Sequence, residues 1–141
     1  MGIDHSKRTL GLALSSPDLS IAMPLKTIQR SGFSADIATL FKLCKEYAVG
    51  GFVIGLPLNM SGTEGPRVDS VRHFAENMIR EKALLGFDPP ISFFDERLST
   101  YAADQFLIER DDLSKKRRGE IIDKLAAQII LQGALEKIRA S

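Results

Sequence analysis

Four acidic residues occupy positions from which a folded chain could bring them to one point: Asp4, Asp95, Glu96 and Asp123. Carboxylates held within a few ångströms of one another repel and resist ionising together, so such a cluster is usually neutralised by divalent cations. Hard oxygen ligands of this kind suit Mg²⁺ or Mn²⁺. Two such ions can activate a water and stabilise the leaving oxygen of a phosphodiester. The four acids therefore predict a metal-dependent phosphodiesterase, provided that the fold makes them converge.

The acids near strand ends also have structural explanations. Asp4 stands where the first expected strand turns, and an aspartate there commonly bonds to the backbone of the turn. Asp95-Glu96-Arg97 follows another strand and could instead be a polar cap near a helix N-terminus. Consecutive strand residues point to opposite faces, so one of the two acids can face the site while the other does not. Arg97 could pair with either acid or hold a phosphate with two hydrogen bonds.

Asp123 continues an otherwise apolar row of the last expected helix, with Ala127 and Ile130 at helical spacing. A carboxylate buried there without a partner would cost several kcal/mol (roughly 2–7 even for a neutral polar group). A metal ion would satisfy it, and so would a salt bridge to Lys124 or Arg118. Both explanations stay open at the level of the sequence.

Basic and short polar side chains near these acids are candidates for holding a nucleic-acid backbone. The basic run before the last helix could equally be a solvated loop, and Thr63 could cap the helix that begins near Pro66. The predicted substrate-binding residues are Lys7, Arg8, Asn59, Thr63, Arg97, Lys115, Lys116, Arg117 and Arg118.

Composition places few further limits on function. The 141 residues are 44% hydrophobic and 26% charged, and they carry a net charge of +1, which by itself indicates no nucleic-acid partner. No apolar run approaches the ~18 residues of a membrane span, and the first residues lack a signal-peptide pattern, so we expect a cytoplasmic protein without membrane contact. The single cysteine, Cys44, falls on an apolar helical stripe and is expected to be a buried core thiol.

Hydrophobic periodicity predicts a succession of strands followed by alternating helices and strands. Three strands are expected within residues 1–30, and Pro24 suggests that the third is an edge strand or carries a bulge. A helix follows with Ser34 as its N-cap and Gly50-Gly51 after its end. The remaining predicted elements are a central strand at 52–54, a helix at 68–83, a strand at 91–94, a helix after Leu98-Ser99-Thr100 and a last helix over 119–138.

The order β-β-β-α-β-α-β-α-α is typical of one mixed five-stranded sheet, a three-strand meander followed by α/β crossovers, with helices on both faces. The chain length fits a single domain over residues 1–141. The predicted fold class is therefore α/β.

Several stretches together resemble the YqgF family, also called RuvX-like, whose members are known as Holliday junction resolvase-like proteins and as nucleases that mature the precursor of 16S ribosomal RNA. The resemblance covers nearly the whole chain. It rests on Gly2-Ile3-Asp4, on residues 55–67 (GLPLNMSGTEGPR), on residues 95–100 (DERLST), and on Asp123 with Ala126-Ala127 and Ile129-Ile130-Leu131.

The resemblance implies an RNase H-like fold and two-metal hydrolysis. It implies that Asp4, Glu96 and Asp123 bind the metal and catalyse the reaction, with Asp95 as a further catalytic residue. One departure stands out, since Ser6 occupies a position that is usually glycine in the family, and Thr9 stands where a basic residue or serine is common. If residue 6 had to adopt a positive φ, serine would cost roughly 1 kcal/mol or more and activity would fall.

The favoured function is hydrolysis of structured RNA at the 5' end of the 16S precursor, with the ribosomal particle as a candidate partner and a monomer or homodimer as the active state. Cleavage of four-way DNA junctions uses the same chemistry and stays open; dimerisation would favour it, because two nicks must be placed symmetrically. A non-catalytic nucleic-acid-binding module is a third alternative, supported by Ser6. Nucleotide phosphotransfer is disfavoured because no second copy of the domain completes a nucleotide cleft.

Overall fold

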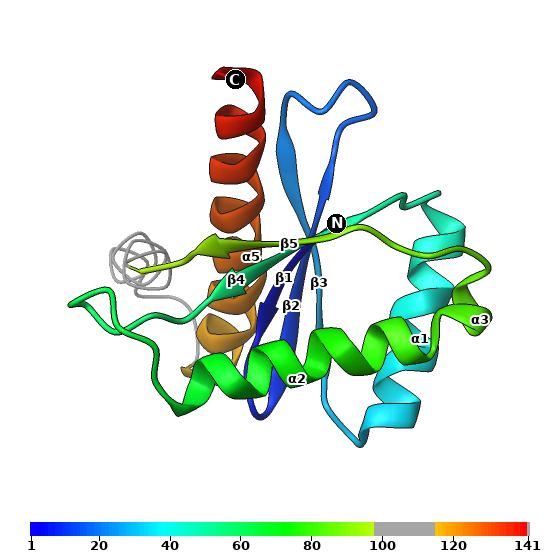
Figure 1. Ribbon diagram of the computed structural model, residues 1–141, viewed down its shortest axis with the longest axis horizontal. Helices are drawn as coiled ribbons and strands as arrows, with labels where there is room; N and C mark the ends of the chain where they lie inside the picture. Colours follow the sequence, from blue (N-terminus) through cyan, green and yellow to red (C-terminus); the bar gives the residue numbers. More distant parts are fainter. Residues whose placement is uncertain (98–114, 141) are drawn as a thin grey trace.

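The computed structural model describes residues 1–97 and 115–140. Figure 1 shows a twisted sheet with helices on either side. The elements are β1 (Gly2–His5), β2 (Thr9–Ser15), β3 (Ala22–Gln29), α1 (Phe33–Glu46), β4 (Phe52–Leu56), α2 (Pro66–Arg80), α3 (Lys82–Leu85), β5 (Ile91–Asp95) and α5 (Lys115–Ala140).

The five strands form one mixed sheet in the order β3-β2-β1-β4-β5. The meander β1-β2-β3 is antiparallel, whereas β4 pairs parallel to β1 and β5 pairs parallel to β4. This confirms the predicted fold class. The centre of the sheet is β1 rather than the strand at 52–54, because the meander adds two strands on one side of β1 and the crossovers add two on the other. That strand, β4, is an interior strand next to the centre.

Pro24 marks both an edge and a bulge, as the sequence predicts. The strand β3 is the outer strand on its side of the sheet. Leu12 pairs with Lys26 whereas the next residue, Ala13, pairs with Pro24, so Leu25 is the extra residue of the bulge. Proline has no backbone N–H to donate. It is tolerated here because no further strand pairs with the outer side of an edge strand.

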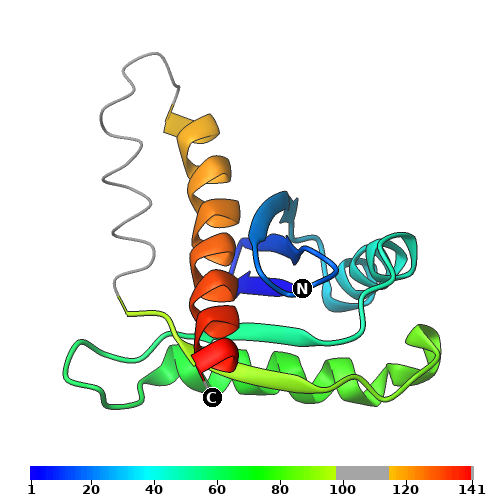
Figure 2. The same cartoon turned by 90° about the horizontal axis from the view of Figure 1, so that it is seen from above.

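Two helical layers cover the sheet, as Figures 1 and 2 show. The long helix α5 crosses one face and contacts all five strands. Its close approach needs small residues, since a Cβ on Gly2 would lie 2.7 Å from Leu131 Cβ. On the other face, α1 and α2 bury apolar side chains against Ile3 and Ile54. Cys44 of α1 is buried in this core, which confirms the predicted core thiol, and burial raises the pKa of that thiol to about 11.

Several helix boundaries differ from the prediction. The N-cap of α1 is Gly32, not Ser34, and the Asp36 carboxylate accepts the Ser31 N–H at 3.0 Å, which fixes the entry to the helix. The helix predicted over 68–83 ends at Arg80, and Ala83 belongs to the separate turn α3. The last helix begins at Lys115 rather than at residue 119. The helix predicted after Leu98 lies outside the described residues.

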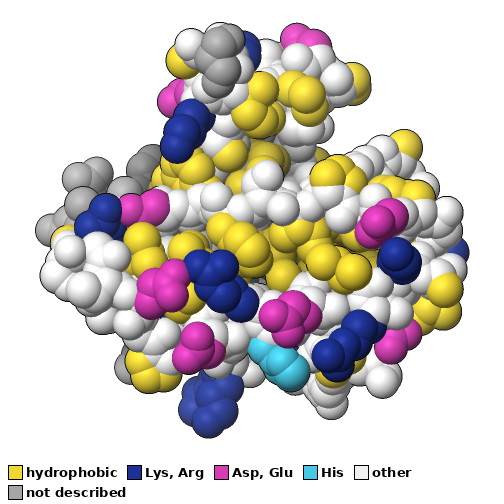
Figure 3. Space-filling view, in the orientation of Figure 1, with side chains coloured by type: hydrophobic (Ala, Val, Ile, Leu, Met, Phe, Trp, Pro, Cys, Tyr) yellow, Lys and Arg dark blue, Asp and Glu magenta, His cyan; other side chains and the backbone are white. Residues whose placement is uncertain are grey.

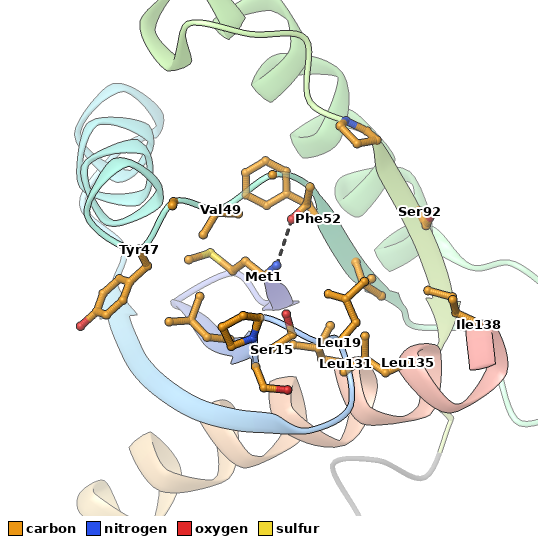
Figure 4. Close-up of a pocket in the computed structure, with 18 residues that line it drawn as sticks. Met1, Ser15, Leu19, Tyr47, Val49, Phe52, Ser92, Leu131, Leu135 and Ile138 are labelled. Atoms are coloured by element: carbon orange, nitrogen blue, oxygen red, sulfur yellow. Dashed lines mark hydrogen bonds between the residues drawn. The ribbon is translucent and has the colours of Figure 1, made fainter.

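A cavity of about 620 Å³ opens at the amino ends of the parallel strands, the end opposite the predicted site (Figure 4). Its lining is mainly apolar and includes Leu19, Leu131 and Leu135. The Met1 ammonium lies in it and donates to the Gly51 carbonyl at 2.9 Å, and burial lowers the pKa of that ammonium. Hydrophobic side chains gather across the middle of the face seen in Figure 3. Among the described residues, no helix is long and apolar enough to cross a membrane.

Candidate nuclease site

Two of the predicted acids lie at the carboxyl ends of the parallel strands β1 and β5, which stand on either side of β4 in the sheet. Asp4 is the third residue of β1, on the same face as Gly2, and therefore points toward α5. Glu96 directly follows β5, and its N–H donates to the Leu56 carbonyl at 3.2 Å. Gly55 makes room for it, since a Cβ at that position would lie 2.7 Å from Glu96 Oε2. Both acids are nearly buried, with exposures of 7% and 8%.

The carboxyl groups of Asp4 and Glu96 are hydrogen-bonded to each other. Burial, followed by repulsion from Asp123, raises the pKa of Asp4 to about 6, although the bond from Glu96 opposes this. Burial and the charge of Asp4 raise the pKa of Glu96 to about 8. Without a cation, the pair therefore retains one proton between its two carboxyl groups at neutral pH.

Asp123 reaches the same region from the first half of α5. The helix backbone lies directly against β2 at Gly11, where an added Cβ would overlap the Asp123 carbonyl group. The Thr9 hydroxyl donates to Asp123 Oδ2 at 2.8 Å. Burial raises the pKa of Asp123, the bond from Thr9 lowers it, and the charge of Glu120 raises it. The half-buried Asp123 thus lies next to the pair and acts on Asp4 through its charge.

The acids suit a divalent cation in their chemistry. Within residues 1–97 and 115–140, no three acidic, histidine or cysteine side chains form a ready-made metal site. Asp4 and Glu96 nevertheless offer two buried carboxyl groups that share a proton, and an ion that replaces this proton would relieve their mutual repulsion. Asp123 is the neighbouring carboxylate that would complete the set. All are hard oxygen donors, as Mg²⁺ and Mn²⁺ prefer.

The raised pKa values predict that the metal-free protein loses stability as pH rises from about 4 to about 8. Unfolded aspartate and glutamate lose their protons near their ordinary pKa values of 3.8 and 4.5, whereas folded Asp4 and Glu96 keep theirs up to about 6 and about 8. The folded state therefore binds more protons in this window, so deprotonation favours unfolding. We expect the melting temperature in EDTA to fall across the window, and Mg²⁺ or Mn²⁺ to raise it more at pH 8 than at pH 5.

The matched control for this titration is the double variant Asp4→Asn, Glu96→Gln, which cannot titrate at either position. Its melting temperature should change less with pH over the same window and should respond less to metal. A wild-type melting temperature that instead rises toward pH 8 in EDTA would contradict the shared proton.

Asp95 does not join the other acids. It points to the opposite face of β5 from Glu96, as the alternation of strand side chains allows, and it is more than a third exposed. Arg97 Nη2 pairs with Asp95 Oδ2 at 2.6 Å, and Arg97 Nη1 donates to the Met60 carbonyl at 3.2 Å. These bonds connect the end of β5 to the loop that follows β4. Arg97 therefore contacts the loop beside the site.

The turn after β1 is built on hydroxyl groups. Ser6 Oγ donates to the Thr9 carbonyl and accepts the Thr9 N–H, both at 3.0 Å, and it lies 2.9 Å from Thr9 Oγ1. Ser6 is not among the described non-glycine residues with positive φ, which are Leu19 and Ala48. The strain considered for serine at position 6 is therefore absent. The hydroxyl instead supports Thr9, which in turn holds Asp123.

Replacing Thr9 by valine should lower cleavage by roughly 10–100-fold, the usual effect of removing a partner that orients a metal ligand. The variant keeps the shape of the side chain but cannot donate to Asp123, so the pKa of Asp123 should rise. In its predicted role as a metal ligand Asp123 has to be ionised, so the acidic limb of the pH–rate profile should move to higher pH. Thr9→Ser keeps the hydroxyl and should stay close to wild type; an unchanged profile in Thr9→Val would refute this role.

The predicted substrate-binding residues take different positions. Lys7 and Arg8 are exposed on the turn between β1 and β2, close to Asp4 in the chain. Asn59 and Thr63 bond to each other, Nδ2 to Oγ1 at 3.0 Å, and close an exposed turn of the loop after β4. Thr63 does not cap α2, whose N-cap is Gly65.

The basic run 115–118 forms the first turn of α5. The side chains of Lys115 and Lys116 lie outside what the structure describes. Arg117 is exposed and Arg118 is half-buried, and the buried Arg118 Nε has no hydrogen-bond partner among the described residues.

One feature of the site, the charge of Arg67, escaped the sequence analysis. Arg67, the second residue of α2, is exposed, and its charge lowers the pKa of both Asp4 and Glu96. The sequence feature that could have indicated Arg67 is its position directly after the loop that ends at Pro66. His5 is buried beside Phe74 and bonds to Arg30 at 3.0 Å. Burial and the Arg30 charge lower the pKa of His5 to about 4, so the ring is neutral and supports the fold beneath Asp4.

Comparison with known proteins identifies the family of this chain. Residues 1–137 match the family model "RuvX: Holliday junction resolvase". The chain belongs to the RuvX family. It is 48% identical over 139 residues to the protein of Rhodospirillum centenum named "Putative pre-16S rRNA nuclease", covering 99% of this chain and 73% of the relative. The Roseobacter denitrificans relative of the same name is 50% identical over 139 residues, covering 99% and 83%.

Solved structures show the fold of this RuvX-family chain in other proteins. RuvC of T. thermophilus in complex with a Holliday junction substrate superposes with a TM-score of 0.59 at 12% identity, covering 99% of this chain and 94% of that one. The Fowlpox virus resolvase with Holliday junction DNA gives a TM-score of 0.51 at 6% identity, covering 97% and 96%. At such identities the likeness establishes the RNase H-like fold. Membership of the family and the names of these relatives make this chain a nuclease.

Proposed function

We propose that this chain is a metal-dependent nuclease that hydrolyses phosphodiester bonds of structured RNA in the maturation of the 5' end of the 16S ribosomal RNA precursor. The observation that carries the proposal is the burial of Asp4 and Glu96 at the carboxyl ends of β1 and β5, with Asp123 beside them. The names of relatives 44–50% identical to the chain support the RNA substrate. Residues 1–141 would act as one domain.

In this proposal, each acid has its own part. Two divalent ions, Mg²⁺ or Mn²⁺, would supply an activated water and neutralise charge on the phosphate. Asp4 and Glu96 would hold metal once they have given up their shared proton, and Asp123 would complete the set. Thr9 keeps Asp123 oriented, and the exposed Arg67 is placed to attract the anionic phosphate toward the acids. Asp95 would act only indirectly, by holding Arg97 against the loop after β4.

The substrate backbone would run over the basic side chains around the acids. Lys7 and Arg8 flank Asp4 on one side, and the first turn of α5 with Arg117 and Arg118 lies beyond Asp123. We place this activity in the cytoplasm, on a precursor ribosomal particle, with a monomer or homodimer as the active form.

Cleavage of four-way DNA junctions is the second candidate. It is favoured by the family description and by the fold shared with resolvases solved on junction DNA. The chemistry would be the same, and the two functions differ in the shape of the nucleic acid that reaches the acids. A resolvase would cut as a dimer, whereas RNA processing needs one active site.

The test is cleavage of end-labelled 16S precursor RNA and of a labelled four-way DNA junction, each with Mg²⁺, with Mn²⁺ and with EDTA. Metal-dependent cleavage of the RNA alone supports the proposal, and paired symmetric nicks in the junction support the second candidate. Metal-independent binding without cleavage of either substrate would overturn both and leave a non-catalytic binding module.

A further inference from the structure

A pocket of about 240 Å³ lies between the edge strand β3 and the first half of α5. Thr27 Oγ1 donates to the Glu120 carbonyl at 2.6 Å and thereby joins the two elements at the floor of this region. Thr27 pairs with Gly11 across the sheet, and Gly11 packs against the Asp123 backbone. The strand β2 therefore separates the pocket from Asp4, and the pocket lies on the side toward the edge of the sheet.

The residues that line the pocket include three cationic residues and one acidic residue. Lys26 comes from β3, whereas Arg117, Glu120 and Lys124 come from successive turns of α5. Within the described part of the chain, neither Lys26 nor Lys124 forms an ion pair. Neither charge is therefore neutralised by an ion pair with another described residue. A local excess of positive charge stands out in a chain whose net charge is only +1.

The pocket also continues a basic path that leads away from the acids. The Arg30 N–H at the end of β3 donates to the Arg8 carbonyl at 2.9 Å, so the turn carrying Lys7 and Arg8 lies beside β3. Lys26 lies within β3, four residues before Arg30, and Lys124 directly follows Asp123. A nucleic-acid strand with one phosphate at the acids would have its next phosphates along this path. The size and the charge of the pocket suit a single phosphate group.

We propose that the pocket between β3 and α5 is a phosphate-binding subsite in which Lys26, Lys124 and Arg117 hold one backbone phosphate of the nucleic acid, apart from the phosphate that is cleaved. This subsite rests on the proposed nuclease function for its ligand, and it deepens that function by fixing the direction in which the bound strand leaves the acids, toward β3. Lysine contacts to phosphate carry no base specificity, so RNA and DNA should both use it.

The experiment measures the affinity of full-length wild type and of the double variant Lys26→Ala, Lys124→Ala for fluorescently labelled precursor RNA and a labelled four-way DNA junction. Titrations run in EDTA over a range of KCl concentrations, so that binding is read without turnover. The variant should bind both about tenfold more weakly at low salt. The slope of log affinity against log salt should fall by roughly 0.7–0.9, the value of one lost phosphate contact.

The matched control is Lys42→Ala, Lys45→Ala, which removes two exposed lysines from α1 on the other face of the sheet. It makes the same change in net charge and should keep the wild-type slope. Equal losses in both double variants, or wild-type binding by Lys26→Ala, Lys124→Ala, would overturn the subsite. Failure of the nuclease function is a separate result, namely intact wild-type binding with no cleavage when Mg²⁺ or Mn²⁺ is added.

Discussion

Asp4→Asn is expected to lower nucleic-acid cleavage by at least about a thousandfold while leaving the fold intact. Asp4 is the acid on which the others act: it shares a proton with Glu96 and is repelled by Asp123. Asparagine has nearly the same volume but cannot carry the negative charge that a divalent cation requires. Without the metal, the transition state loses several kcal/mol of stabilisation. Each 1.4 kcal/mol of that loss slows the reaction about tenfold.

The measurement is single-turnover cleavage of labelled RNA with saturating Mg²⁺ or Mn²⁺, accompanied by a melting curve for each protein. Asp88→Asn is the matched control, because it makes the same chemical change at an exposed residue whose ion pair with Lys82 spans 3.7 Å. It should cleave like wild type. If Asp4→Asn keeps more than a tenth of the wild-type rate, Asp4 is not a metal ligand and the proposed site is wrong.

Gly11→Ala should have the largest effect on the folded state. An added Cβ would overlap the carbonyl group of Asp123 and approach the Lys124 nitrogen at 3.1 Å, both of them helix backbone. Backbone cannot rotate out of the way as a side chain does, so α5 must move away from β2. Overpacking of this kind costs about 1–3 kcal/mol or more. The displaced helix would also carry Asp123 away from Thr9, so we expect cleavage to fall with stability.

Chemical denaturation measures the loss of stability. Cleavage at a temperature where the variant stays folded measures the loss of activity. Gly50→Ala is the control, because nothing lies within 4 Å of a Cβ at Gly50 and its φ is not in the positive range. That substitution should change the free energy of unfolding by no more than about 1 kcal/mol, if anything toward greater stability. A Gly11→Ala variant as stable and active as the control would show that α5 does not approach β2 in this way.

The two substitutions probe different parts of one arrangement. Asp4 tests what the carboxylates do chemically, whereas Gly11 tests how the chain positions them. The site depends on both, since the acids come from β1, from the residue after β5 and from α5. A loss of cleavage in Gly11→Ala with normal metal-free binding of RNA would separate positioning from substrate affinity.

The sequence by itself determined the fold class and the pattern of the sheet. Alternation and apolar runs report which face of an element is buried, and that is enough to predict three leading strands and two crossover strands. The bulge at Pro24 follows from proline's missing donor, and the opposite directions of Asp95 and Glu96 follow from the pleat of a strand. These are local properties of consecutive residues.

Only the tertiary structure decided how the acids meet. The bond from Thr9 to Asp123 joins residues 114 positions apart, and it exists because α5 packs closely on Gly11. The bond from Arg97 to the Met60 carbonyl, the charge of Arg67 on the acids, and the pocket that Lys26 and Lys124 line all join residues far apart in the sequence, so no local pattern predicts them. Hydrophobic periodicity indicates that a helix buries one face. Which element packs against that face, and which side chains meet there, depends on how the whole chain packs.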